Sequence, residues 1–137
     1  MTGPRQVTET LIDEFRANDG KLASFGDMPL LVLHSTGAKT GDERLSILIY
    51  QDLGGSWAIF ASNGGSPNNP AWYHNIIANP RVEIEVGSST HKAIARVANE
   101  AERRRIWGAQ RETMPEIDDF AARSSRVIPV VVLDPVP

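Results

Sequence analysis

The 137-residue sequence contains no cysteine. Disulfide bonds, iron–sulfur clusters, thiolate-bound zinc and cysteine nucleophiles are therefore all excluded. Lysine is scarce, since Lys21, Lys39 and Lys92 are the only three, and the net charge is −3. Proteins that bind nucleic acid normally need a basic surface to displace counterions, so we predict no nucleic-acid partner and expect a small-molecule substrate.

Long apolar runs are missing as well. No stretch approaches the length of a transmembrane helix, and the N-terminus has no basic region followed by an apolar segment. We therefore expect a cytoplasmic protein. The length, with 41% hydrophobic and 23% charged residues, fits a single globular domain over residues 1–137.

Common catalytic and metal-binding patterns are also absent. No Ser-His-Asp set or pair of acids has a spacing that would support one, and His34, His74 and His91 lack the spacing of metal ligands. We predict no metal site, and we interpret His34 as a partly buried, hydrogen-bonded histidine at the end of an apolar strand. Hydride transfer remains open to such a protein, because a bound redox cofactor supplies the reactive atoms.

A glycine loop that runs into an aromatic helix is the most informative segment present, ASNGGSPNNPAWYHN at residues 61–75. Gly64 and Gly65 permit positive φ angles and close backbone approach, Asn69 is a good N-cap, and Pro70 suits the first helical turn. The unpaired amides and the helix dipole would then face an anionic or planar ligand in the loop. The alternative is a plain strand-to-helix connection whose aromatic residues fill the core.

A second glycine-rich segment, TGAKTGDER at residues 36–44, separates two apolar runs and places Lys39 and Arg44 beside paired glycines. Such a turn can hold phosphate, and the alternative is a solvated hairpin tip. The segment is not a Walker A loop, because Lys39 precedes Gly41 rather than following it, so a P-loop NTPase is excluded.

Hydrophobic periodicity predicts a small α+β domain without internal repeats. The apolar stripe of the first helix, formed by Val7, Leu11, Ile12 and Phe15, packs on the sheet in our interpretation, with a membrane or a partner as alternatives. Pro129 removes a ladder donor and indicates a sheet edge or a strand start. Asn99 and Glu102 form a capping signature, and the basic run 103–105 reads as a solvated helix face. The predicted elements are helices at 4–18, 70–78, from 99 through 107, and 116–123, and strands at 28–35, 45–50, 56–61, 81–86, 92–97 and 126–132.

Together these segments closely resemble the deazaflavin-dependent nitroreductase family, whose small enzymes use coenzyme F-420 on a split β-barrel related to the flavin-binding pyridoxamine oxidases. The motifs that carry the resemblance are residues 36–41 with Arg44, 61–65, 70–75 with 78–80, and 126–132. It implies a six-stranded antiparallel split β-barrel flanked by helices, of the pyridoxamine oxidase-like or FMN-binding type. It also implies a reductase that passes a hydride from the reduced deazaflavin to an electron-poor acceptor.

By resemblance, the phosphate and acidic tail of the deazaflavin lie toward the 36–44 turn, and its ring lies between a strand and the aromatic helix. Ser62 is a hypothetical catalytic residue that would donate a hydrogen bond or a proton. The implied cofactor-binding residues are Ala38, Lys39, Thr40, Arg44, Leu45, Ser46, Ile47, Leu48, Ile49, Phe60, Ala61, Ser62, Asn63, Ala71, Trp72, Tyr73, His74 and Asn75.

The sequence departs from the family pattern at positions that bear on the ligands. Family members commonly carry a basic residue at the position of Ala38, another near Asn63, and a proline at the position of Ile47, so the anionic tail is held with less charge here. Met114, Ile117 and Phe120 fall where relatives that reduce nitroimidazoles place tyrosines, and they predict an apolar substrate pocket without a phenolic proton donor. We therefore expect a quinone or an unsaturated lactone to be reduced in preference to a nitroimidazole.

Two other functions stay open at this stage. One is an FMN-dependent split-barrel oxidoreductase that holds the FMN phosphate with Arg44 and Lys39. The other is a non-catalytic deazaflavin carrier. Split barrels often dimerise, so a homodimer is a further prediction, and weak membrane association through the first helix is the alternative role of its apolar stripe.

Overall fold

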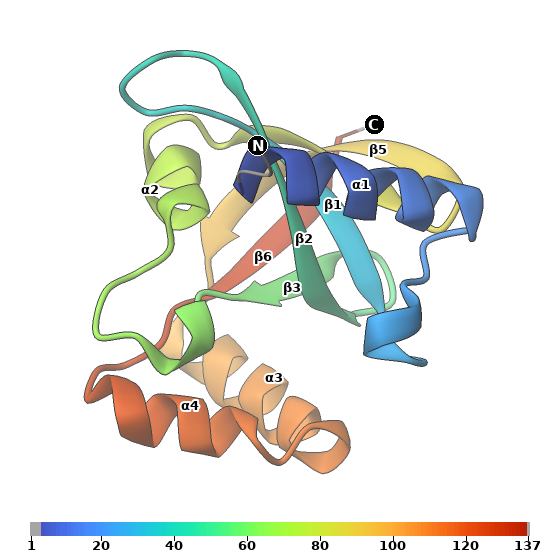
Figure 1. The fold of residues 1–137 in the computed structure, drawn as a ribbon. Coiled ribbons are helices and arrows are strands. Elements are labelled where there is room, and N and C mark those ends of the chain that lie inside the picture. The colour runs from blue at the N-terminus through green and yellow to red at the C-terminus, as the bar shows by residue number, and fades with distance from the viewer. Residues whose placement is uncertain (1–3, 137) are drawn as a thin grey trace.

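The computed structural model describes residues 4–136, with side chains from residue 9 onward, and its centre is a closed barrel of six strands (Figure 1). The strand order is β1-β2-β3-β6-β5-β4, and every neighbouring pair is antiparallel. The predicted six-stranded antiparallel split barrel with flanking helices is therefore confirmed. The strands are β1 Leu30–Thr36, β2 Glu43–Asp52, β3 Trp57–Phe60, β4 Arg81–Val86, β5 Ser89–Val97 and β6 Val130–Pro135. The helices are α1 Pro4–Ala17, α2 Ala71–Ala78, α3 Glu100–Thr113 and α4 Ile117–Ser124, with 3-10 turns η1 Ala23–Phe25 and η2 Asn63–Gly65.

Strand β1 is buried on both faces, as its apolar sequence predicts. Leu31 and Leu33 point into the barrel core, where they join Ile59. Leu30 and Val32 belong to a second cluster that lies under α1. The first strand is therefore the wall that joins the barrel core to the N-terminal helix.

Helix α1 packs its apolar stripe on the barrel, which supports the interpretation that this stripe faces the sheet and not a membrane or a partner. Ile12 and Phe15 are almost fully buried and share a cluster with Leu22, Leu30 and Val32. Figure 1 shows the helix lying across β1 and β2. The side chain of Val7 lies outside the described residues. In residues 4–136, no helix combines the length and apolarity that crossing a membrane requires.

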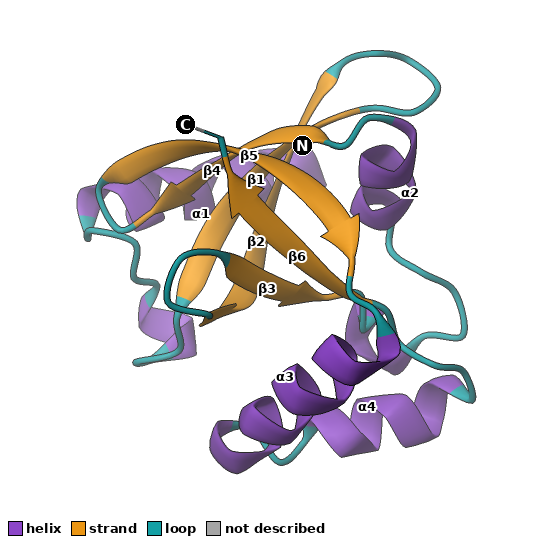
Figure 2. Cartoon of the chain, turned by 180° about the vertical axis from the view of Figure 1, so that it is seen from behind, coloured by secondary structure: helices purple, strands orange, loops and turns teal. Residues whose placement is uncertain are grey.

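Helices α3 and α4 cover the lower end of the barrel together (Figure 2). The predicted capping box is present: Glu102 N–H donates to Asn99 Oδ1 at 2.8 Å, and Asn99 N–H donates to Glu102 Oε1 at 3.1 Å. The interpretation of residues 103–105 as a solvated face is wrong for Arg103. Its Nε donates to the Ile128 carbonyl at 3.0 Å, and its guanidinium lies 4.7 Å from the ring centroid of Trp107.

The predicted starts of β6 and of α2 need correction, and α3 continues beyond residue 107 to Thr113. Strand β6 begins at Val130, not at Arg126, because Pro129 has no N–H to give to the ladder; its interpretation as a strand start is confirmed. Asn69 is not the N-cap of α2. Pro70 occupies that position without a side-chain cap, and the Asn69 side chain instead accepts a hydrogen bond from Arg126.

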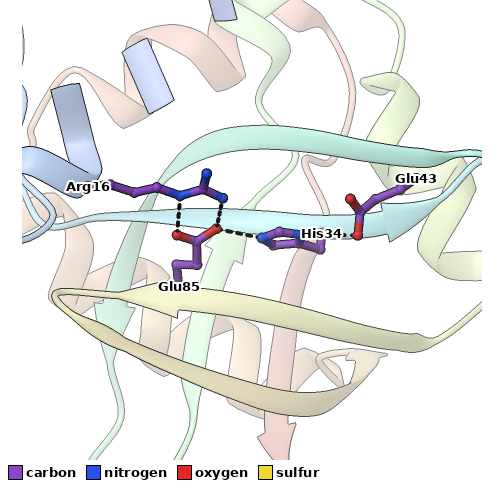
Figure 3. Close-up of polar contacts among 4 residues, drawn as sticks. All are labelled: Arg16, His34, Glu43 and Glu85. Atoms are coloured by element: carbon purple, nitrogen blue, oxygen red, sulfur yellow. Dashed lines mark hydrogen bonds and ion pairs between the residues drawn. The ribbon is translucent and has the colours of Figure 1, made fainter. Parts of the chain in front are cut away.

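A chain of four charged or titratable side chains ties α1 to the sheet (Figure 3). Arg16 donates from Nε and Nη2 to the two carboxylate oxygens of Glu85 at 2.9 and 2.8 Å. His34 Nε2 lies 2.6 Å from Glu85 Oε2, and its Nδ1 lies 3.2 Å from Glu43 Oε2. His34 is therefore the partly buried, hydrogen-bonded histidine that the sequence predicts. The hydrogen bond from Arg16, with a smaller contribution from His34, lowers the pKa of Glu85 to about 2.

This pKa predicts an acid-dependent loss of stability. A carboxyl whose pKa is lower in the folded state than its ordinary 4.5 stabilises the fold above that value, and the stabilisation is lost as the pH falls toward 2. Between pH 6 and pH 3, we expect the free energy of unfolding of the wild type to fall by about 1 kcal/mol more than that of Glu85→Gln, after allowing for the half-exposed Arg16 partner. Urea unfolding at each pH measures the difference. Glu100→Gln, which removes an exposed carboxylate on α3, is the matched control and should keep the wild-type slope; equal slopes for all three proteins would contradict the prediction.

Candidate functional site

Two adjoining cavities meet at the buried side chain of Trp72 on α2. The first, which we call the turn cavity, has a volume of about 830 Å³ and lies between the β1–β2 turn and α2. It is lined by Gly37, Ala38, Lys39, Thr40, Arg44, Leu45, Ser46, Ala71, Trp72, His74 and Asn75. The second, the apolar cavity, has a volume of about 530 Å³ and lies between β2, η2 and α4. It is lined by Phe25, Leu30, Ile47, Leu48, Ile49, Phe60, Ser62, Asn63, Gly64, Pro70, Trp72, Met114, Ile117 and Phe120.

The β1–β2 turn is held in shape by its own backbone and by α2. Gly37 N–H donates to the Asp42 carbonyl at 2.7 Å, and Gly41 N–H donates to the Gly37 carbonyl at 2.9 Å. Gly41 has a φ of 75°, a conformation that glycine adopts without strain. The buried Asn75 side chain accepts from Ala38 N–H at 3.0 Å, so the turn is fastened to the helix that forms the opposite wall.

The turn cavity suits an anion. Its lining carries two cations, Lys39 and Arg44, and no carboxylate. Within the described part of the chain, neither cation forms a hydrogen bond or an ion pair, and both are exposed. Because their donors are uncommitted, they can bind phosphate or carboxylate oxygens without breaking an existing contact.

One edge of β2 is left free along both cavities. Within the described strands, β3 pairs with β2 only from Tyr50 to Asp52, whereas β1 pairs with β2 from Glu43 to Ile49. Tyr50 N–H donates to the Pro29 carbonyl, so in this regular antiparallel register Tyr50 and every second residue before it bond toward β1. The N–H and C=O groups of Leu45 and Ile47, which lie between them, therefore point away from β1, toward the two cavities. At residue 49 the pairing of Tyr50 with Ile59 already engages this edge with β3. The free groups of Leu45 and Ile47 offer alternating donors and acceptors to a planar heterocycle.

The apolar cavity has few polar groups. Ile47 and Ile49 line it from β2, and Met114, Ile117 and Phe120 line it from the α3–α4 region. Ser62 and Asn63 are the polar side chains among its lining residues. In the described residues the Ser62 hydroxyl has no hydrogen-bond partner, which leaves it able to donate to a bound molecule.

The structure brings most of the predicted site residues to these cavities. Two predicted residues, Ala61 and Tyr73, do not line either one: Ala61 is fully buried in the barrel core, and Tyr73 lines a separate groove of about 520 Å³ with Val97 and Val127. Those at the turn cavity are Ala38, Lys39, Thr40, Arg44, Leu45, Ser46, Ala71, Trp72, His74 and Asn75. Those at the apolar cavity are Ile47, Leu48, Ile49, Phe60, Ser62, Asn63, Met114, Ile117 and Phe120.

Two residues at the apolar cavity escaped the analysis of the sequence, Phe25 and Leu30. Leu30 reads simply as part of a buried strand. Phe25 reaches the cavity because η1 folds the chain between α1 and β1 back against β2, and no local pattern indicates this. An exposed aromatic residue in a connecting segment was the only available signal.

A split barrel with a cationic turn beside an apolar pocket is the arrangement expected of a small redox protein that holds a phosphate-bearing cofactor ring. Comparison with known proteins identifies the particular family. The model of the F-420H(2)-dependent quinone reductases matches residues 7–135, and the chain belongs to this family. An F-420H(2)-dependent quinone reductase of Mycobacterium tuberculosis is 39% identical over 124 residues, which cover 87% of this chain and 83% of the relative.

Solved structures agree with this membership. An F-420-H2 dependent reductase (FDR-A) is 33% identical, with a TM-score of 0.71, over 77% of this chain and 94% of its own. A second structure, described as a domain-swapped dimer, is 31% identical, with a TM-score of 0.73, over 95% and 96% of the two chains. The predicted family, oxidoreductase class and deazaflavin cofactor are confirmed.

Proposed function

We propose that this protein reduces quinones, with the phosphate and acidic tail of coenzyme F-420 in the turn cavity and the acceptor in the apolar cavity. The observation that carries the proposal is the meeting of a cationic cavity and an apolar cavity along the free edge of β2. When bound, the reduced deazaflavin supplies a hydride. The quinone takes up this hydride and one proton, so that the cofactor is oxidised and a quinol leaves.

Each wall of the site has its own task. Lys39 and Arg44 would hold the anionic groups, and the free backbone groups at residues 45 and 47 would hydrogen-bond the ring. Trp72 separates the two cavities and would fix the plane of the ring by packing against it. The Ser62 hydroxyl would donate a hydrogen bond to the acceptor oxygen, and water is the alternative proton source.

The acceptor preference follows from the lining of the apolar cavity. Within the described residues, Ser62 and Asn63 contribute its polar side chains, and no phenol or carboxyl group lines it. A quinone is flat and largely apolar, and it can take its proton from water after hydride transfer. A nitroimidazole gains more from a positioned acid, a contribution that is commonly a hundredfold or more.

The test is a fluorescence titration followed by turnover. Quenching of Trp57, Trp72 and Trp107 is measured with oxidised F-420 and, in parallel, with FMN, and then menadione or a nitroimidazole is added to the reduced complex. We expect binding of F-420 in preference to FMN, rapid reoxidation by menadione, and a kcat/KM for menadione at least about tenfold above that for the nitroimidazole. Preference for FMN would overturn the cofactor assignment, and binding without reoxidation by any quinone would favour a deazaflavin carrier.

The assembly of the protein is a separate proposal. The relative that is described as a domain-swapped dimer supports our prediction of a homodimer. Membrane association through α1 is less well supported, because the described part of its apolar stripe is buried against the barrel.

A further inference from the structure

The side chain of Arg126 gathers a loop that is distant in sequence and borders the apolar cavity. Arg126 lies between α4 and β6, and among the described residues its three guanidinium nitrogens donate only to residues 61–69. Nε donates to the Ser66 carbonyl at 3.2 Å, and Nη1 donates to Asn69 Oδ1 at 2.6 Å. Nη2 donates to the carbonyls of Ala61 at 3.0 Å, Asn68 at 3.2 Å and Ser62 at 3.4 Å.

The loop needs such an anchor because its backbone is costly to hold. Asn63, Gly64 and Gly65 follow one another with φ angles of 48°, 63° and 88°. Glycine adopts such angles without strain, but it loses more conformational freedom on folding than any other residue, so contacts from outside the loop are needed to hold the two glycines in one conformation. The carbonyls before and after this turn are the ones that Arg126 binds, so the guanidinium closes the loop at both ends.

The same loop lies flush against α4. A methyl group added at Gly65 would stand 3.3 Å from Arg123 Nε and 3.5 Å from the Phe120 carbonyl, so the loop backbone packs closely against the helix. Helix α4 in turn supplies Ile117 and Phe120 to the apolar cavity, whereas the loop supplies Ser62, Asn63 and Gly64. The position of the loop relative to α4 therefore sets the distance between two walls of that cavity.

We propose that Arg126 is a positioning residue that fixes the spacing of these walls and so aligns the acceptor with the cofactor. The inference rests on the proposed function for its kinetic meaning. Arg126 does not itself line either cavity, and within the described residues no carboxylate forms an ion pair with it. Its guanidinium group donates hydrogen bonds to acceptors of the loop. The planar arrangement of its N–H groups allows it to reach five acceptors at once.

Kinetics of Arg126→Ala test the proposal. We expect kcat with menadione to fall by about tenfold to a hundredfold, because misplacing reacting groups by about an ångström has effects of that size. The dissociation constant for F-420 should rise by less than about threefold, since the turn cavity is fastened through Ala38 and Asn75 instead. Millimolar guanidinium chloride should restore part of kcat to this variant, whereas sodium chloride at the same ionic strength should not.

Two further variants keep the test decisive if Arg126→Ala folds poorly. Asn69→Ala removes the one side-chain acceptor of Arg126 and should lower kcat less than Arg126→Ala does. Arg126→Lys keeps the positive charge but loses the planar guanidinium group, and its kcat should stay well below that of the wild type. Unchanged kcat in all three variants would overturn the proposal, and so would a proportional loss of kcat, cofactor binding and stability without rescue by guanidinium.

A second readout separates this inference from the proposed function. Limited proteolysis of the 61–69 loop should be faster in Arg126→Ala than in the wild type and should slow again with guanidinium. If the wild type fails to reduce quinones, the proposed function falls while this proteolysis result still tests the anchoring of the loop. Equal proteolysis rates in the two proteins would overturn the anchoring itself.

Discussion

Replacing Arg44 with alanine is expected to weaken the binding of oxidised F-420 by roughly ten- to a hundredfold. A hydrogen bond to a charged partner contributes about 1.5–3 kcal/mol, and about 1.4 kcal/mol corresponds to a factor of ten in affinity. Arg44 and Lys39 are the two cations of the turn cavity, so the loss of one cannot be covered by another neighbour. Lys39→Ala should have the smaller effect, because an ammonium group binds as a point charge without the bidentate fork.

Controls for this experiment come from the same chain. Arg104→Ala removes an exposed guanidinium on α3 that pairs with Glu100, away from both cavities, and should leave the dissociation constant unchanged. Rising salt concentration should weaken the binding of F-420 to the wild type more than to Arg44→Ala. Salt screens the attraction between the cofactor's anionic groups and Arg44, and the variant lacks that attraction. Unchanged affinity in Arg44→Ala would contradict the assignment and would move the anion-binding role to the backbone amides at the start of α2.

The barrel could be predicted from the sequence because its strands carry their signals locally. Residues 81–86 alternate strictly, and β4 buries Val82 and Ile84 while exposing Arg81 and Glu83. The capping box at Asn99 is equally local. The predicted start of α2 was wrong. Asn69 has a high N-cap propensity, but its side chain accepts a hydrogen bond from Arg126, which is 57 residues away in the sequence. Long-range hydrogen bonds of this kind leave no trace in a local pattern.

The candidate site, too, was predictable where its signals are local in the sequence and unpredictable where it depends on tertiary packing. The glycine turn and the aromatic helix are contiguous motifs, so their residues were identified and the fold places them on facing walls of one cavity. The free edge of β2 depends on where β3 stops pairing, and the contribution of Phe25 depends on the path of η1. Both are consequences of tertiary packing. The apolar character of Met114, Ile117 and Phe120 can be read from the sequence directly. That they share a cavity with Ile47, which is distant in the sequence, could be predicted only from the family resemblance.

Phe15→Ala is expected to have the largest effect on stability. Phe15 belongs to α1, is fully buried, and packs in the cluster that contains Leu22, Leu30 and Val32. Truncating a buried phenylalanine costs about 3–5 kcal/mol, from lost apolar burial and from the cavity that remains. For a domain of this size, such a loss lowers Tm by about 10–15 °C. Urea and thermal unfolding followed by circular dichroism measure both quantities.

Phe25→Ala is the matched control, since it removes the same side chain from a position where it is 41% exposed. We expect it to cost less than about 1 kcal/mol of stability and to raise the KM for menadione, because Phe25 lines the apolar cavity. Phe15→Ala should change both properties, since its cluster also contacts Ile47 and Ile49 from behind the cavity. An equal loss of stability in the two variants would show that α1 is not anchored through Phe15. A loss confined to Phe15→Ala would instead show that the N-terminal helix supports β2 through the cluster that packs on Ile47 and Ile49.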